Sequence, residues 1–160
     1  MASLIENLIT GLNEEYAVYQ KLLEVSMEKT SAIVSNDLDR LRTTTDKEQL
    51  LVDQVTGMEN VRRQTMDNIA TVLNKKSSEL RITDVITFLE GQPEFHDPLL
   101  EINEKLAKLA KKLKSVNVHN QNLIKESLSM IEYNINLMQN LNRAPETAEY
   151  SRDMFKNKGR

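Results

Sequence analysis

The chain lacks several of the residues on which common classes of function depend. Its 160 residues include no cysteine and no tryptophan, and only four glycines and three prolines. Without cysteine there are no disulfides, no thiolate chemistry and no cysteine-ligated zinc, and such a composition suits a reducing cytoplasm. No basic segment precedes an apolar core, and no run nears the roughly 20 apolar residues that span a bilayer, so neither a secretory signal nor membrane insertion is expected. The net charge of −3 argues against nucleic acid as the main partner.

Recognisable catalytic and metal-binding motifs are also missing from the sequence. The two histidines, His96 and His119, lack the glutamate three residues earlier that helical di-metal proteins use. There is no glycine-rich phosphate loop, no His-Glu-x-x-His helix and no Gly-x-Ser-x-Gly elbow. Scattered carboxylates on helices are usually solvated, so we expect no enzyme activity, no cofactor and no metal. The alternative, a carboxylate bundle that holds a metal, would be excluded by metal analysis of the pure protein.

The remaining composition favours long helices. The chain is 39% hydrophobic but only 4% aromatic, which argues against a strand-rich fold. Apolar residues recur at steps of three and four over residues 3–34, with Ser3 predicted as the N-cap and Glu6 at the capping-box spacing. A turn signal at residues 35–37 ends this helix, and a second helix is expected over residues 37–74.

A short helix and a third long helix are expected to follow. Thr83 is placed to cap the short helix, and Gly91 is placed to end it. Asp97-Pro98 then predicts the start of the last helix, residues 98–142. Short loops between long helices require antiparallel neighbours. The sequence therefore predicts an all-α fold over residues 1–142: an elongated antiparallel bundle of three long helices with one short connecting helix.

The last helix changes its apolar pattern half way along. Its first half carries one seam, formed by Ile102, Leu106, Leu109, Leu113 and Val116. Beyond Asn120 a second stripe joins the seam, and the face becomes wide enough for two neighbours. We predict that this wide face binds a partner, with methionines that adapt to another chain's packing. The predicted binding residues are Leu123, Ile124, Leu128, Met130, Ile131, Ile135, Leu137 and Met138. The alternative is that the first two helices cover both stripes as ordinary core.

Polar residues lie at the point where the two patterns meet. Asn117, His119 and Asn120 either fix the register of a buried seam, as polar residues at such positions do, or mark the junction between the bundle and a binding face. A basic cluster precedes them. It consists of Lys105, Lys108, Lys111, Lys112 and Lys114. This face is either solvated, with glutamate–lysine pairs along the helix, or a docking site for an acidic surface or anionic lipid.

Three segments carry a family resemblance. The first runs from Lys47-x-x-Leu50-Leu51 to Met58-Glu59-x-x-Arg62-Arg63. The second is Leu113-Lys114-x-Val116-Asn117-x-His119-Asn120-x-x-Leu123-Ile124. The third is a proline-bearing tail with a tyrosine, Pro145 to Tyr150, although the family often has Tyr-Gly where this chain has Tyr150-Ser151. Together with the length and helical order, these segments resemble the FlgN-type flagellar export chaperones over nearly the whole chain.

The resemblance implies a cytoplasmic binding protein without enzyme activity. Family members hold the hook–filament junction proteins, hook-associated proteins 1 and 3, soluble and deliver them to the flagellar type III export gate. The resemblance implies that the cargo's helical terminal segment is engaged by the last helix, on the wide face already described. The main alternative is a homodimeric structural or regulatory coiled-coil protein without cargo, in which that face closes the dimer.

The end of the chain, residues 143–160, contains Pro145 and loses the helical period, which predicts a flexible tail. Tyr150, Met154 and Phe155 nevertheless give it apolar anchors, compatible with one face of a short helix formed on binding. The resemblance implies that the tail tyrosine docks onto the cytosolic domain of the export gate. The alternative is an unstructured end with three incidental apolar residues.

Overall fold

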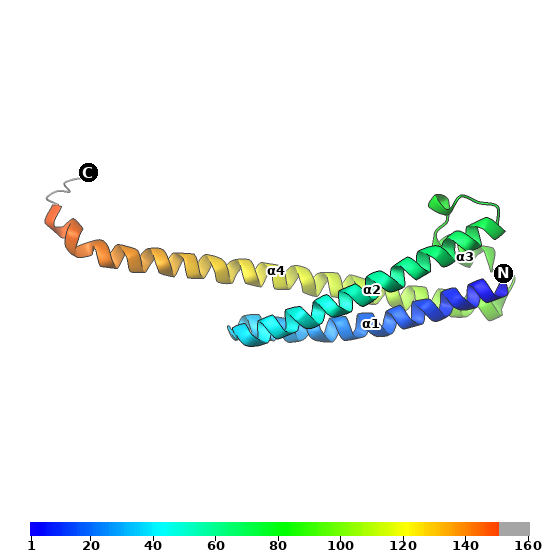
Figure 1. Ribbon diagram of the computed structural model, residues 1–160, viewed down its shortest axis with the longest axis horizontal. Helices are drawn as coiled ribbons and strands as arrows, with labels where there is room; N and C mark the ends of the chain where they lie inside the picture. The colour runs from blue at the N-terminus through cyan, green and yellow to red at the C-terminus, as the bar shows by residue number, and fades with distance from the viewer. Residues whose placement is uncertain (151–160) are drawn as a thin grey trace. The chain divides into compact units, whose positions relative to one another are not determined.

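The computed structural model describes the backbone of residues 1–150 and the side chains of residues 1–141. Its elements are α1 (Ala2–Val34), α2 (Leu38–Val72), the 3-10 turn η1 (Ser77–Glu79), α3 (Ile82–Phe88) and α4 (Pro93–Tyr150) (Figure 1). Every regular element in this part of the chain is a helix, so the predicted all-α class is confirmed. The chain divides into two compact units, Met1–Asn120 and Gln121–Arg160, and α4 contributes to both.

The helix α1 begins earlier than the capping pattern predicts. The carbonyl of Met1 accepts hydrogen bonds from the amides of Leu4 (3.0 Å) and Ile5 (3.1 Å), and no side chain caps the helix. The predicted N-cap at Ser3 is therefore wrong, because Ser3 lies inside the first turn. Ile5 is completely buried, so core packing, rather than a cap, anchors this end of α1.

A short turn joins α1 to α2, which lies beside it and runs in the opposite direction (Figure 1). Asn36 adopts the left-handed conformation (φ 55°), which asparagine tolerates better than most residues. The amide of Asp37 then donates to the carbonyl of Ala32 (3.0 Å) and closes α1. The side chain of Asp37 accepts from the amide of Arg40 (3.1 Å) and so caps α2, within the segment 35–37 where a turn was predicted.

The short helix α3 is capped differently from the prediction. The amide of Arg81 donates to the carboxylate of Asp84 (2.8 Å), and the helix begins at Ile82. Thr83, predicted as the N-cap, lies inside the helix instead. A carboxylate in the first turn also interacts favourably with the helix dipole, which a threonine hydroxyl does only weakly. Gly91, predicted to end this helix, lies in the turn that follows it.

The start of α4 also differs from the prediction. The carbonyl of Gln92 accepts hydrogen bonds from the amides of Phe95 (3.0 Å) and His96 (2.9 Å), and Pro93 takes the first helical position. The start predicted at Asp97-Pro98 is wrong, because Pro93 meets the same requirement earlier in the chain. At the other end, α4 continues past residue 142, where the helix was predicted to end, to Tyr150.

Residues 143–150 are thus helical in the structure rather than the start of a tail. Their composition supports this correction, because Ala144, Glu146, Ala148 and Glu149 are among the strongest helix formers. A proline in a helix interior removes one backbone hydrogen bond and costs about 3 kcal/mol, and α4 nevertheless continues past Pro145. Residues 151–160 lie outside the described part of the chain, so the prediction of a flexible tail there stays a prediction.

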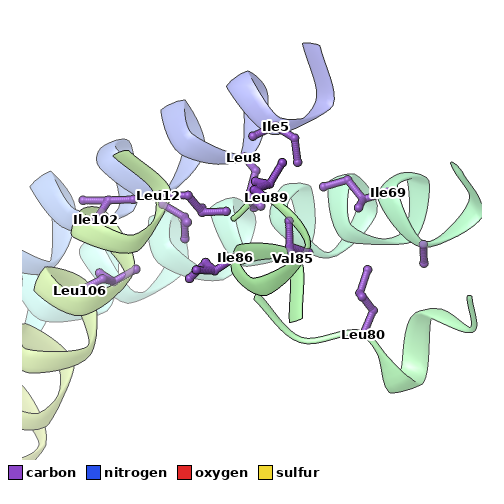
Figure 2. Packing of buried hydrophobic residues seen from close by; sticks show 12 residues of the cluster. Ile5, Leu8, Leu12, Ile69, Leu80, Val85, Ile86, Leu89, Ile102 and Leu106 are labelled. Carbon is purple, nitrogen blue, oxygen red and sulfur yellow. The ribbon is translucent and has the colours of Figure 1, made fainter. Parts of the chain in front are cut away.

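The largest hydrophobic cluster of the first unit gathers around α3 (Figure 2). Its buried members are Ile5, Leu8, Leu12, Ile69, Ala70, Leu80, Val85, Ile86, Leu89, Leu99, Ile102 and Leu106. They come from all four α-helices and from the loop before α3, so α3 is a part of the core and not merely a connection. Each fully buried Leu or Ile contributes about 1.5–3 kcal/mol, so this cluster contributes substantially to the stability of the first unit.

Candidate functional site

The seam predicted for the first half of α4 is present in the structure. Ile102, Leu106 and Leu113 are buried, and Leu109 and Val116 are half-buried. The next position at the same spacing is Asn120, and the exposed fraction of this residue is only 3%. Asn120 therefore extends the buried seam of α4 by one more position, although its side chain is polar.

Asn120 lies in a polar cluster formed with α1. Its amide nitrogen donates to the backbone carbonyl of Ser26 (2.9 Å), and its side-chain oxygen accepts from the hydroxyl of Thr30. The hydroxyl of Ser26 lies 3.0 Å from a carboxylate oxygen of Glu48 on α2 and 3.4 Å from the side-chain oxygen of Asn117. These contacts join α1, α2 and α4 at one level. Asn120 is a buried polar residue at a seam position, as the register-fixing interpretation expects, whereas Asn117 is exposed.

The hydrogen bonds also set the direction of α4 against α1. Asn117 contacts Ser26, and Asn120 contacts Thr30, at sequence separations of 91 and 90. Because the separation is almost constant, the two helices run parallel within the first unit. Farther toward the start of both helices, the ammonium of Lys105 lies 5.0 Å from the ring centre of Tyr16, in a cation–π contact. All five lysines of the basic cluster are exposed.

A second polar cluster, which the sequence reasoning missed, lies between α1 and α2. Glu15 is completely buried, and one of its oxygens accepts from the guanidinium of Arg62 (3.0 Å). Burial raises the pKa of the Glu15 carboxyl, the Arg62 charge opposes that rise, and the Glu59 charge adds to it. Tyr19 donates to Glu59 (3.3 Å), and burial together with that carboxylate raises the pKa of the Tyr19 hydroxyl. The sequence did contain a signal that Glu15 is buried, because Glu15 lies at the three- and four-residue spacing of the apolar residues on the core side of α1.

A groove of about 280 Å³ opens between α1 and α2 beside this cluster. It is lined mainly by Leu8, Gly11 and Glu14 of α1 and by Gly57, Met58 and Val61 of α2. A β-carbon added at Gly11 or at Gly57 would meet no atom within 4 Å. The two glycines are therefore not required for close helix packing, and they leave the groove wider than alanines would.

The second unit contains the wide apolar face, and there most of its residues are exposed. Leu123 and Ile124 are half-buried. Leu128 retains 54% of its exposure, Met130 64% and Ile131 53%. Ile135, Leu137 and Met138 are exposed to a similar degree. The described residues of this unit form a single helix, so the unit itself supplies no second element to cover the face.

The geometry of a helix places these residues on one half of α4. At about 100° per residue, Ile124, Leu128, Ile131, Ile135 and Met138 form one stripe, and Leu123, Met130 and Leu137 form the other. Tyr133, which the sequence reasoning did not include, lies beside the second stripe and is 64% exposed. An exposed apolar surface of this extent is unusual for a monomeric protein.

The remaining predicted site residues are not placed by the structure. The side chain of Tyr150 and the whole of Met154 and Phe155 lie outside the described residues. Within the described part, no group of three His, Cys, Asp or Glu side chains is arranged to hold a metal ion. Over the same residues, none of the helices combines the length and the hydropathy needed to traverse a bilayer.

The described part of the chain is all-helical, and its second unit exposes an apolar face of α4. Comparison with protein families gives the particular family: the model described as "FlgN protein" matches residues 1–153. The chain therefore belongs to the FlgN family of flagellar export chaperones, and the resemblance found in its sequence is confirmed. No curated protein and no solved structure matches it.

Proposed function

We propose that this chaperone binds a helical terminal segment of hook-associated protein 1 or 3 through the apolar face of α4, and delivers it in the cytoplasm to the flagellar export gate. The protein acts by binding alone and catalyses no reaction. In this proposal α1, α2 and residues 93–120 of α4 form an up-down-up bundle, and residues 121–141 of α4 bind the cargo. One observation carries the proposal: an apolar half of a helix, with eight predicted contact residues, is largely exposed in the unit to which it belongs.

The size of the face is adequate for a specific complex. A fully exposed Leu or Ile contributes about 1.5–3 kcal/mol when buried, so a half-exposed one contributes roughly 1 kcal/mol. The side chains of the two stripes together approach the roughly 8 kcal/mol that corresponds to micromolar affinity, before the cost of ordering the partner is subtracted. A helix laid on a helical face is a common mode of peptide recognition.

The test is the double variant Leu128→Asp with Ile135→Asp, co-expressed with each candidate cargo and analysed by pull-down. Two carboxylates in the centre of the face should abolish binding at micromolar concentration, because a buried unpaired charge costs far more than the lost apolar contact. Circular dichroism and thermal melting should match the wild type, since both positions are exposed. The matched control, Ser129→Asp with Asn136→Asp, adds the same charge to the polar side of the helix and should bind normally.

A double variant that unfolds would show that the face belongs to the core of the protein. A folded double variant that still binds cargo would move the site elsewhere. The same exposed face also favours a second function, closure of a homodimer without cargo. Light scattering of the pure protein, alone and with cargo, separates the two: a chaperone exchanges any self-association for a mixed complex, whereas a structural coiled coil keeps its dimer.

The delivery step rests on Tyr150, Met154 and Phe155. We propose that these three apolar side chains dock onto the cytosolic domain of the export gate. The support comes from the family membership and from the apolar character of these residues in a polar end of the chain. Titration of the purified gate domain with the chaperone–cargo complex, wild type and Tyr150→Ala, tests this step. Superimposable binding curves would remove Tyr150 from it.

A further inference from the structure

One heptad position of α4 changes character along the helix. At intervals of seven residues it carries Leu106, Leu113, Asn120, Ser127, Asn134 and Leu141. The two leucines in the first unit are buried, and so is Asn120. Asn134 lies two heptads farther on and is exposed. The same residue type thus occurs twice at the same helical position, once covered by another helix and once uncovered.

The covered copy shows how such an asparagine is satisfied. Asn120 donates through its amide nitrogen to the Ser26 carbonyl (2.9 Å) and accepts from the Thr30 hydroxyl. The Thr30 hydroxyl also lies 3.1 Å from that same carbonyl, so the asparagine, the hydroxyl and the carbonyl form one closed polar group. A helix that runs parallel to α4 and carries a threonine or serine in its apolar stripe provides both hydrogen-bond partners: the hydroxyl as donor and a backbone carbonyl as acceptor.

The uncovered copy has apolar neighbours on every side of the helical surface. Met130 and Ile131 precede Asn134 by four and three residues, and Leu137 and Met138 follow it by three and four. All four are exposed, and they belong to the two stripes that bound the wide face. Any helix that covers both stripes also covers the asparagine amide, which then needs a donor and an acceptor on that helix.

We infer that Asn134 selects the partner helix. The face prefers a helix whose apolar stripe contains a threonine or serine, with the hydroxyl hydrogen-bonded to Asn134 as the Thr30 hydroxyl is to Asn120. This inference rests on the proposed function, and it adds the chemistry by which the face discriminates. A helix with an apolar residue at that point would leave the buried amide unpaired. The penalty corresponds to roughly a 10-fold loss of affinity.

The experiment measures binding of full-length hook-associated proteins 1 and 3 to the full-length chaperone, by titration calorimetry. Each serine and threonine in the cargo's bound helical segment is replaced in turn by alanine or by the nearly isosteric valine. One of these replacements should weaken binding to the wild type about 10-fold and should leave binding to Asn134→Leu unchanged. The matched control, Asn136→Leu, makes the same change on the polar side of α4 and should retain the wild-type discrimination.

Two results would overturn the inference. One is that no serine or threonine replacement affects binding. The other is that Asn134→Leu responds to the critical replacement as strongly as the wild type does. Failure of the proposed function looks different, because then the Leu128→Asp and Ile135→Asp double variant binds cargo normally. If that double variant loses binding while Asn134→Leu keeps full discrimination, the face is the site and only the role of Asn134 is wrong.

Discussion

The two parts of α4 have similar apolar content but opposite surroundings. In residues 93–120, the apolar side chains of the seam are buried or half-buried against the other helices of the first unit. In residues 121–141, most of the apolar side chains are exposed. Hydrophobicity alone therefore does not separate a buried core face from an exposed one. The width of the apolar surface, compared with the helices available to cover it, separates them.

The largest expected effect tests this contrast directly. Leu106→Ala removes a buried side chain and leaves a cavity, so it should lower the free energy of unfolding by about 2–5 kcal/mol. Leu137→Ala makes the same chemical change at a position that is 46% exposed, and it should cost less than about 0.5 kcal/mol. Urea denaturation of the free protein measures both. Equal losses at the two positions would mean that residues 121–141 are part of the core.

A somewhat smaller effect is expected when the ion pair between Arg62 and Glu15 in the first unit is broken. The described residues of the second unit contain no such pair. Arg62→Met leaves the buried Glu15 carboxylate without its cation and should cost about 3 kcal/mol at neutral pH. The pKa of Glu15 is already raised by burial, and loss of Arg62 raises it further. Because the folded state then binds a proton more readily than the unfolded state, the cost should shrink as the pH falls toward the ordinary value near 4.5.

The measurement is urea denaturation of wild type and Arg62→Met at several pH values. Arg63→Met is the matched control, because Arg63 is exposed and contacts Asn60 (2.8 Å) on its own helix. It should change stability by only a few tenths of a kcal/mol, and its effect should not depend on pH. An Arg62→Met penalty that stays constant from neutral to acidic pH would show that the lost contact is packing rather than charge compensation.

The smallest expected effect concerns helix propensity. Gly57→Ala should raise the free energy of unfolding by about 0.5–1 kcal/mol, because Gly57 lies in a helix interior and the added methyl group meets no atom within 4 Å. Ser129→Ala also improves helix propensity, but in the second unit. If the cooperative transition reports only the first unit, Ser129→Ala should leave the denaturation midpoint unchanged. A comparable increase from both changes would show that the two units unfold together.

The sequence predicted those features that depend on local spacing. The seam of α4, the width of its second apolar face and the turn at residues 35–37 all follow from residue type and helical period. The helix starts were less predictable. Pro98 competes with Pro93, which meets the same requirement earlier in the chain, and α1 starts at Met1 without any side-chain cap. Only packing decides between such candidates.

The two polar clusters show where the sequence was not sufficient. Glu15 and Arg62 are separated by 47 positions, and nothing in their local sequence pairs them. Asn120 and Asn134 have the same residue type and the same heptad position, yet one is buried and the other is exposed. The difference lies in whether a helix covers that level of α4, and this is a property of tertiary structure.

The short turn at Asn36 and Asp37 has a consequence for the order of folding. It makes α1 and α2 a hairpin whose contacts nearest the turn are close in sequence, and we expect such contacts to form early because little chain entropy is lost in closing them. The hydrogen bonds from Asn117 and Asn120 to α1 join residues about 90 positions apart. We therefore expect the contacts of the α1–α2 turn to form before α4 joins the bundle. The last helix then docks onto a surface that is already formed, as its own cargo is proposed to do later.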